Sequence, residues 1–151
     1  MPRLQKSDVV PPPWKIRAVG TAKIGDRVAK IGRTSGLTTG TVESVDLRVN
    51  LGGFGRLLLV KDCLKIKGDG PDFSLAGDGG AAIVREDGAV LGIIIGAFAG
   101  SKDKSGSSIA CPIEPALKQL GLELLTSDGS TASVNAPKRR RSPRRSGRKT
   151  K

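Results

Sequence analysis

Histidine and tyrosine are absent from this sequence of 151 residues, and aromatic side chains make up only 3% of it. Without histidine the chain cannot form a His-ligated zinc site, and we predict no metal and no cofactor. Trp14 is the single tryptophan, so the core has to be built from Val, Ile, Leu and Ala. Together with 21 glycines, which imply many turns, this composition favours a compact β protein over a helical bundle.

Cysteines and long apolar runs are also scarce. Cys63 and Cys111 are too few for a disulfide framework and too far apart in sequence for a metal knuckle. Reduced, buried thiols are the favoured interpretation, and one disulfide is the alternative if the chain meets an oxidising compartment. The longest apolar stretch, Ala89 to Ala99, is about half as long as a bilayer span, and the N-terminus lacks the apolar run of a secretory signal. We therefore expect a soluble, intracellular protein with no membrane contact.

The formal charge of +12 is unevenly distributed along the chain. Residues 138–151 (KRRRSPRRSGRKTK) hold nine of the 26 basic residues and no acid, which leaves 17 basic against 14 acidic residues in the rest of the chain. The basicity is chiefly a property of this tail. Because no apolar periodicity follows Leu125, we predict that residues 126–151 form a disordered basic tail.

Short apolar segments broken by Gly, Asp and Ser run from Gly20 onward, as is typical of short antiparallel strands. Residues 1–19, with three consecutive prolines, are predicted to be an extended lead-in. Strands are predicted at 27–32, 39–51, 56–66, 81–85, 89–96 and 107–112, with hairpin turns at 52–55 and 86–88.

The period then changes to that of a helix over 113–120. Glu114 and Pro115 suit its first turn, and Gly121 suits its C-terminal cap. The predicted fold is an all-β, six-stranded antiparallel barrel with a short C-terminal helix.

Three stretches resemble segments of the trypsin-like (chymotrypsin-fold) serine proteases. VAKIGRTSGLTTGTV at 28–42 is similar to the segment that opens their second barrel. FSLAGDGGAAIV at 73–84 resembles their nucleophile turn, Gly-Asp-Ser-Gly. AVLGIIIGAFAG, followed by IACPIEPALKQLGLEL, resembles their closing strands and C-terminal helix. The resemblance implies a second β-barrel over about residues 20–125 and covers only that half of the family's two-barrel fold.

The same resemblance argues against the family's activity. Acyl transfer by this route needs a serine hydroxyl, an imidazole, a carboxylate that orients it, and oxyanion donors. The family's nucleophile position falls on Gly79, and its histidine and aspartate come from the first barrel. Ser74 is no simple substitute, because it lies five residues upstream on the loop that would line the substrate pocket. We predict no catalytic residue in this chain.

Four residues would form the remnant of the nucleophile turn: Gly77, Asp78, Gly79 and Gly80. By resemblance, the amides of Gly77 and Gly79 would point at an oxyanion and form a small anion nest. The favoured alternative is a glycine-rich turn that merely connects two strands. Asp78 would, by resemblance, stay buried and hold the turn through hydrogen bonds, although an aspartate in such a turn needs no such role.

The resemblance also implies a remnant of the primary specificity pocket. Phe73 would lie at its base, with Phe98, Ala99 and Gly100 on its wall. A pocket floored by phenylalanine would be apolar and shallow. The alternative is that the phenylalanines are ordinary core residues.

Two kinds of partner are predicted. A second barrel normally buries one flank against the first, so that flank should invite a protein partner or a second copy of the chain. The basic tail is dense enough for non-specific nucleic-acid binding or for nuclear import, and a solvated tail without a partner is the alternative. Its candidate contacts are Lys138, Arg139, Arg140, Arg141, Arg144, Arg145, Arg148 and Lys149.

The sequence therefore favours a catalytically inactive, protease-related module that acts in binding, with a tail that directs it to the nucleus or to nucleic acid. Two other hypotheses stay open. The chain is a fragment or subunit of a serine endopeptidase whose first barrel is made separately, or it is a plain, non-specific nucleic-acid-binding protein.

Overall fold

The computed structural model describes residues 15–53, 56–98 and 106–134, and it contains all six predicted strands. Their bounds agree with the predicted ranges to within about three residues at each end, because alternation of side chains along a strand is readable locally. The six strands are β2 (Arg27–Gly32), β3 (Gly36–Gly53), β4 (Arg56–Gly68), β5 (Ala82–Arg85), β6 (Ala89–Ala97) and β7 (Ser107–Pro112).

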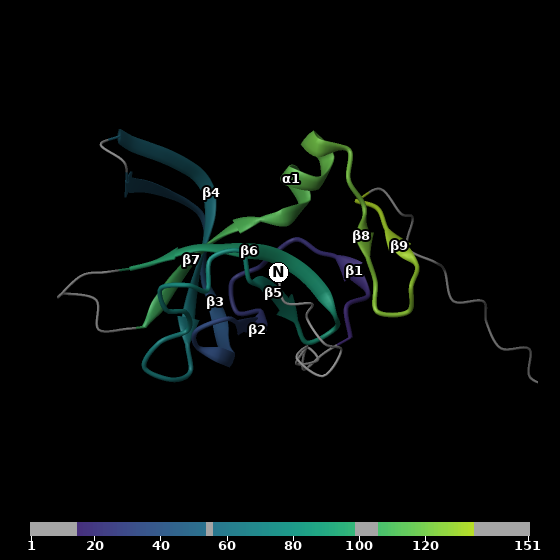
Figure 1. Ribbon diagram of the computed structural model, residues 1–151, viewed down its shortest axis with the longest axis horizontal. Helices are drawn as coiled ribbons and strands as arrows, with labels where there is room; N and C mark the ends of the chain where they lie inside the picture. The colour runs from purple at the N-terminus through teal and green to yellow at the C-terminus, as the bar shows by residue number, and fades with distance from the viewer. Residues whose placement is uncertain (1–14, 54–55, 99–105, 135–151) are drawn as a thin grey trace, which may run out of the picture.

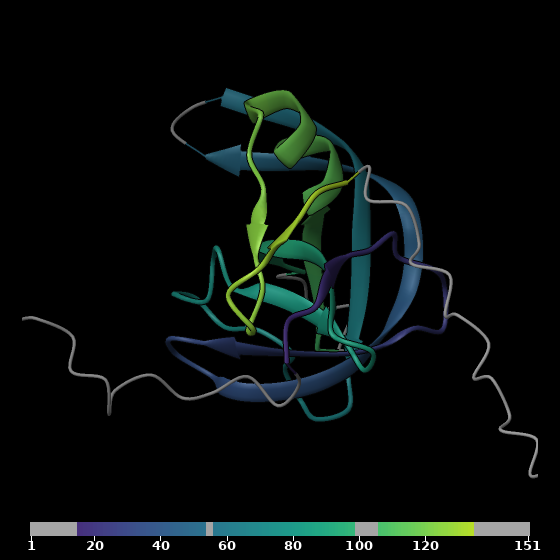
Figure 2. The same ribbon diagram turned by 90° about the vertical axis from the view of Figure 1, so that its right-hand side faces the viewer.

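These strands close into a ring, which confirms the predicted six-stranded antiparallel barrel. The order is β6-β5-β2-β3-β4-β7, and β7 pairs back onto β6. Every pairing in the ring is antiparallel. Figure 2 shows the long strands β3 and β4 curving around one side of the ring. Closure leaves the ring itself without an open edge.

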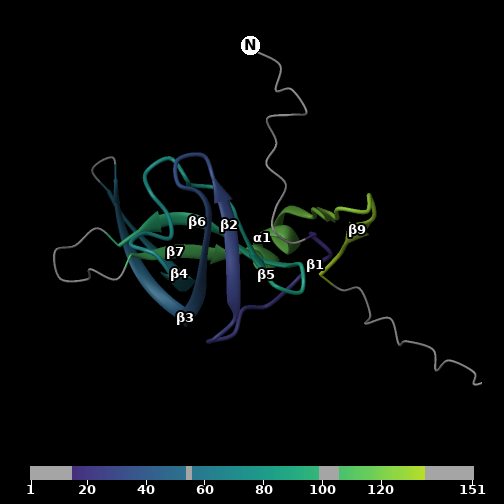
Figure 3. The ribbon, with the colours of Figure 1, turned by 90° about the horizontal axis from the view of Figure 1, so that it is seen from below.

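Strands β3 and β4 are longer than the rest of the barrel requires. Their pairing shifts register three times between Val42 and Val49, and Asp46 and Asp62 adopt φ values of 60° and 58°. Such bulges bend a strand and increase its twist. The outer end of this β3–β4 ribbon projects away from the ring on the side opposite α1 and β9 (Figures 1 and 3).

The predicted helix is α1 (Ile113–Leu120), which follows β7 directly and contacts β6. Leu117 is its buried residue. Gly121 caps its C-terminus in the left-handed conformation with φ 63°, as predicted, and its amide donates to the Lys118 carbonyl. In the described ranges no helix has the length and apolar character needed to cross a membrane.

Two short pairings lie outside the predicted barrel boundaries. Strand β1 (Ala18–Val19) runs parallel to the start of β6, within the segment predicted to be an extended lead-in. Strands β8 (Leu124–Leu125) and β9 (Thr131–Ala132) form a hairpin, so residues 126–134 differ from the predicted disorder.

Polar contacts explain why the hairpin was missed. The Thr126 hydroxyl and the Ser130 amide both donate to Asp128, and the Ser127 amide donates to the Ile16 carbonyl over 2.9 Å. Hydrogen bonds of this kind leave no apolar periodicity in the sequence. The rest of the predicted tail and residues 1–14 lie outside the described part of the chain, as do Phe54 and Gly55 of the predicted turn.

The barrel interior is aliphatic, with one phenylalanine. Phe73 comes from the loop between β4 and β5, and it is fully buried in a core cluster whose other members come from all six strands of the ring. The other buried core residues are Val28, Val42, Leu64, Ile66, Ile83, Ala89, Leu91, Ile94 and Ala110.

Candidate functional site

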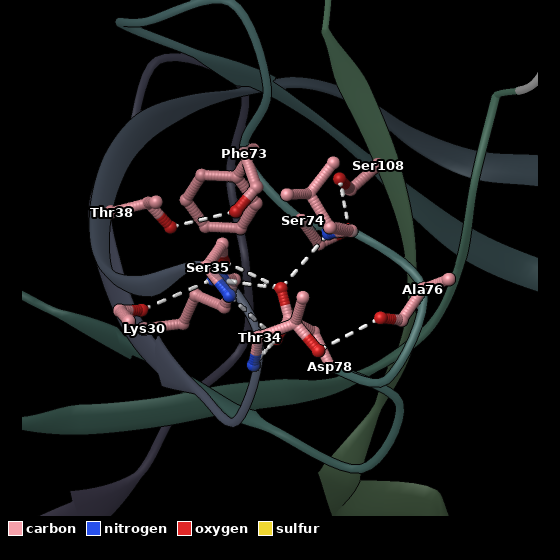
Figure 4. Close-up of polar contacts among 11 residues, drawn as sticks. Lys30, Thr34, Ser35, Thr38, Phe73, Ser74, Ala76, Asp78 and Ser108 are labelled. Carbon is pink, nitrogen blue, oxygen red and sulfur yellow. Dashed lines mark hydrogen bonds and ion pairs between the residues drawn. The ribbon is translucent and has the colours of Figure 1, made fainter.

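The predicted nucleophile turn lies in the loop between β4 and β5, and the buried carboxylate of Asp78 organises it. Asp78 is only 1% exposed. One of its oxygens accepts from the backbone amides of Thr34 (2.7 Å) and Ser35 (3.2 Å). The other accepts from the Leu75 amide (2.9 Å) and the Ser35 hydroxyl (2.5 Å). These bonds tie the turn to the segment that links β2 and β3 (Figure 4).

Lys30 supplies the positive charge for this carboxylate. It lies on β2, is 1% exposed, and places its Nζ 3.4 Å from Asp78 Oδ2. The same Nζ donates to Ser35 Oγ and to the Gly36 carbonyl, and it lies 5.5 Å from the centre of the Phe73 ring. A buried lysine is tolerated when it has such partners, so the pair and its hydrogen bonds form one unit.

Competing effects set the pKa values of the pair. Burial works to raise the pKa of Asp78, but hydrogen bonds from Leu75, Ser35 and Thr34 outweigh it and hold the pKa below its ordinary value. Burial lowers the pKa of Lys30, and the charge of Asp78 opposes this shift. Asp78 is therefore ionised at neutral pH, and its charge opposes the loss of a proton from Lys30.

Glycine is required at two places around the carboxylate. A Cβ on Gly32 would lie 2.3 Å from Asp78 Oδ1, so only glycine lets β2 approach the turn. Gly77 has φ 103°, and a Cβ there would lie 2.3 Å from Thr34 Oγ1. Both positions therefore serve the packing of Asp78 and its donors.

Gly79 is different from these two glycines. It is exposed, its φ lies outside the left-handed region, and an added Cβ would meet no atom within 4 Å. A side chain at position 79 would therefore be accommodated without strain. Position 79 has space for a side chain, and the glycine there carries no hydroxyl.

The backbone of the turn bears on the predicted anion nest. The Gly80 amide donates to the Ile94 carbonyl over 2.8 Å, which joins the turn to β6. Within the described ranges, no protein acceptor takes the amides of Gly77 or Gly79. The anion nest stays a prediction.

Ser74 lies next to the turn but is not poised as a nucleophile. Its side chain is buried, and its Oγ shares a 2.5 Å hydrogen bond with Ser108 Oγ from β7. The neighbouring Phe73 carbonyl accepts from Thr38 Oγ1 over 2.7 Å (Figure 4). These contacts attach the loop to β3 and β7, which is a structural role.

The structure separates the two phenylalanines of the predicted pocket. Phe73 is part of the barrel core, whereas Phe98 is half-buried after β6 with Lys65 Nζ 5.4 Å from its ring centre. Ala99 and Gly100 lie outside the described residues. The placement of Phe73 agrees with the alternative of a core residue, and the pocket itself stays a prediction.

All eight candidate tail contacts, Lys138 to Lys149, also lie outside the described residues. On the barrel, Lys61, Lys65 and Lys67 lie on β4. Lys65 pairs with Glu43 over 2.9 Å. Among the described residues, no group of three or more His, Cys, Asp or Glu side chains is arranged to hold a metal ion.

Sequence reasoning missed Lys30, Thr34 and Ser35, the residues that stabilise Asp78. All three lie inside the segment 28–42 that carries the resemblance. A signal was present, since a carboxylate expected to be buried needs a cation and hydrogen-bond donors. The sequence offers many basic residues, however, and only the fold selects Lys30.

Comparison with solved structures gives trypsin-like serine proteases as structural neighbours. A glutamic-acid-specific serine protease, described as using a histidine triad in substrate binding, is 31% identical with a TM-score of 0.57 over 70% of this chain and 51% of its own. Thermobifida fusca protease A is 24% identical with a TM-score of 0.60, over 74% of this chain and 55% of its own. Cellulomonas bogoriensis chymotrypsin is 20% identical with a TM-score of 0.60, over 74% of this chain and 56% of its own. No protein-family model and no curated protein matches the chain.

The fold and the turn thus define the class: a β-barrel of the chymotrypsin type, similar in structure to trypsin-like serine proteases. The chain spans about half the length of these neighbours.

Proposed function

We propose that the chain is a catalytically inactive counterpart of the second barrel of trypsin-like serine proteases and that it acts by binding. The observation that carries the proposal is the turn at Asp78, which keeps a fully satisfied buried carboxylate next to a glycine at the nucleophile position. Hydroxyl and imidazole are both required for acyl transfer, and the sequence has no histidine. Ser74 does not replace the missing hydroxyl, because its Oγ is buried against Ser108.

A serine-reactive fluorophosphonate probe tests inactivity directly. We expect no labelling of the wild-type chain, and none of Gly79→Ser, because a serine at 79 would have no imidazole to take its proton. Gly79→Ser should fold as well as wild type, since its Cβ enters open space. Stoichiometric labelling of the wild-type chain would overturn the proposal, and Ser74→Ala would then show whether Ser74 reacts.

For binding, we propose the flank formed by α1 and β8, where α1 and β8 lie close together (Figure 1). Leu120, Leu122 and Leu125 are 68%, 56% and 67% exposed, and they follow one another closely in sequence. Exposed large apolar side chains favour association. The expected partner is a protein or a second copy of the chain.

Sedimentation velocity tests the homodimer first. We expect a concentration-dependent dimer at micromolar concentration that weakens in a Leu120→Ser/Leu122→Ser variant. Leu57→Ser, at an exposed position on the far β3–β4 ribbon, is the matched control and should leave the dimer unchanged. A clean monomer at all concentrations would exclude the homodimer and leave only a different protein as partner.

The tail is proposed to provide nuclear import or non-specific contact with nucleic acid. Nine basic residues without an interleaved aromatic offer phosphate contacts but no base stacking. A mobility shift should weaken steeply with salt and vanish when residues 138–151 are deleted. Persistence of the shift would move the site to the barrel, with Lys61 and Lys67 as candidates.

A second candidate function is supported by the share of the neighbours that the chain covers. Because it matches about half of each, a separately made barrel bearing histidine and aspartate could complete a serine endopeptidase. Gly79 would still limit such a complex to the weak catalysis that oxyanion donors supply. Sequencing upstream of Met1 for a histidine-bearing barrel distinguishes the two functions.

A further inference from the structure

The two cysteines, distant in sequence, are brought together by the closure of the barrel. Strands β4 and β7 pair antiparallel, and the last rung of their ladder is Leu64 with Ala110. Cys63 and Cys111 are the next residues on each strand, so the same register, continued by one rung, would place them opposite each other. Residues directly opposite in an antiparallel pair lie about 4.5–5.5 Å apart at Cα, within the range of about 4.4–6.8 Å found for disulfides.

The pKa of Cys63 also reflects this neighbour. Burial, and then the proximity of Cys111, raise the pKa of the Cys63 thiol to about 11. Both cysteines are free thiols in the structure. Since Leu64 and Ala110 belong to the barrel core and strand side chains alternate, the cysteine pair lies on the outer face of the two strands.

The two positions differ in access to solvent. Cys63 is fully buried, whereas Cys111 is half-buried at the end of β7. A reagent in solution therefore meets Cys111 first. Cys63 is the buried residue of the pair, on the neighbouring strand, so the two positions suit an attacking thiol and a resolving thiol.

We propose that Cys63 and Cys111 form a modification site, a cross-strand dithiol that small disulfides such as oxidised glutathione convert into an intramolecular disulfide. The Cys111 thiolate attacks one glutathione sulfur, forms a mixed disulfide and releases one glutathione thiolate. The Cys63 thiolate then attacks the Cys111 sulfur and releases the second. The protein dithiol loses two electrons, oxidised glutathione gains them, and the two protons of the protein thiols end on two glutathione molecules.

The bond would strengthen a short contact in the ring. Strands β4 and β7 pair over four rungs only, from Leu64–Ala110 to Lys67–Ser107. The disulfide would add a covalent tie there and close a loop that holds residues 64–110, including the turn at Asp78. Closing a loop of this length restricts the unfolded chain and should raise the thermal midpoint by about 10 °C.

The test uses the full chain, incubated with oxidised glutathione and then digested without reduction. We expect a peptide that joins Cys63 to Cys111, loss of both titratable thiols, and a raised thermal midpoint that dithiothreitol reverses. Cys63→Ser should instead accumulate a glutathione adduct on Cys111. Cys111→Ser should react much more slowly than wild type, because Cys63 is buried.

The linked peptide from the wild-type chain decides the matter even if a variant fails to fold. A stable glutathione adduct on wild-type Cys111, disulfide-linked dimers, or equal reactivity of the two cysteines would each overturn the proposal. This site is independent of the proposed function, so loss of partner binding would leave it untouched.

Discussion

Two ion pairs start from the same strand, β2, and they differ in almost every respect. Arg27 forms two parallel hydrogen bonds to Asp69 at 2.7 and 2.6 Å, with both side chains 44% exposed. Lys30 lies 3.4 Å from Asp78, with both side chains fully buried. The Arg27–Asp69 pair has the shorter distances, whereas the Lys30–Asp78 pair stabilises the turn of the candidate site.

Solvent explains the difference. Water competes for the exposed pair and screens it, so such pairs contribute little to stability. The buried pair has no water to replace a lost partner, and its cost of desolvation is offset only while every bond is made. In this barrel, the distance between the charged atoms is therefore a poor indicator of how much an ion pair contributes to stability, and burial is a better one.

The largest expected effect is that of Asp78→Ala. Removing the carboxylate leaves the Lys30 ammonium buried and unpaired and frees the amides of Thr34 and Leu75. We expect the free energy of unfolding in urea to fall by about 3–5 kcal/mol. Asp69→Ala is the matched control on the exposed pair. Equal losses in the free energy of unfolding for Asp78→Ala and Asp69→Ala would contradict the conclusion that the buried pair matters more than the exposed pair.

The second prediction is a pH dependence that belongs to Asp78. Because its folded pKa is held below the ordinary value, its contribution to stability is present above the unfolded pKa of about 3.9 and is lost as pH falls towards the folded value. Urea midpoints measured from pH 7 to pH 2.5 should show wild type losing stability below about pH 4. The difference in urea midpoint between wild type and Asp78→Asn should become smaller in that pH range. A difference that stays constant with pH would contradict the assignment of this pH dependence to Asp78.

The third prediction compares two glycines of the turn. Gly77→Ala places a Cβ against Thr34 at φ 103° and should cost about 1–3 kcal/mol. Gly79→Ala enters open space at an unstrained φ and should change stability by less than about 1 kcal/mol. Thermal unfolding of both variants is the measurement. A large loss in Gly79→Ala would mean that position 79 is constrained in a way that its backbone does not reveal.

The smallest effect is expected for Asp69→Asn. Arg27 then keeps its hydrogen bond to Thr41 and its contact with water. We expect an unfolding midpoint that differs from wild type only at low salt, and by less than any change at Asp78. A loss that persists at high salt would show that the exposed pair contributes more than screening allows.

Much of the fold could be predicted from sequence because it depends on local patterns. Alternating side chains located β2 to β7, and Glu114, Pro115 and Gly121 located the ends of α1. The two short pairings were missed because Ala18–Val19 and Thr131–Ala132 are too short to show a period.

The candidate site divides in the same way. The resemblance of SLAGDGG to a nucleophile turn predicts that Gly79 stands at the nucleophile position, and glycine has no hydroxyl whatever the fold. Local sequence patterns could not predict that Lys30 and Ser35 contact Asp78, or that Lys30 lies over the Phe73 ring. These contacts form only when the closed ring brings β2 and the turn together.

By itself, therefore, the sequence determined the strands, the helix, the absence of histidine and the glycine at position 79, because periodicity and residue identity are properties of neighbours along the chain. Only the tertiary structure decided which cation meets Asp78 and that Cys63 and Cys111 lie next to the paired residues Leu64 and Ala110. Both pairs join residues almost fifty positions apart. Their contact depends on strand register around a closed barrel, which no local pattern encodes.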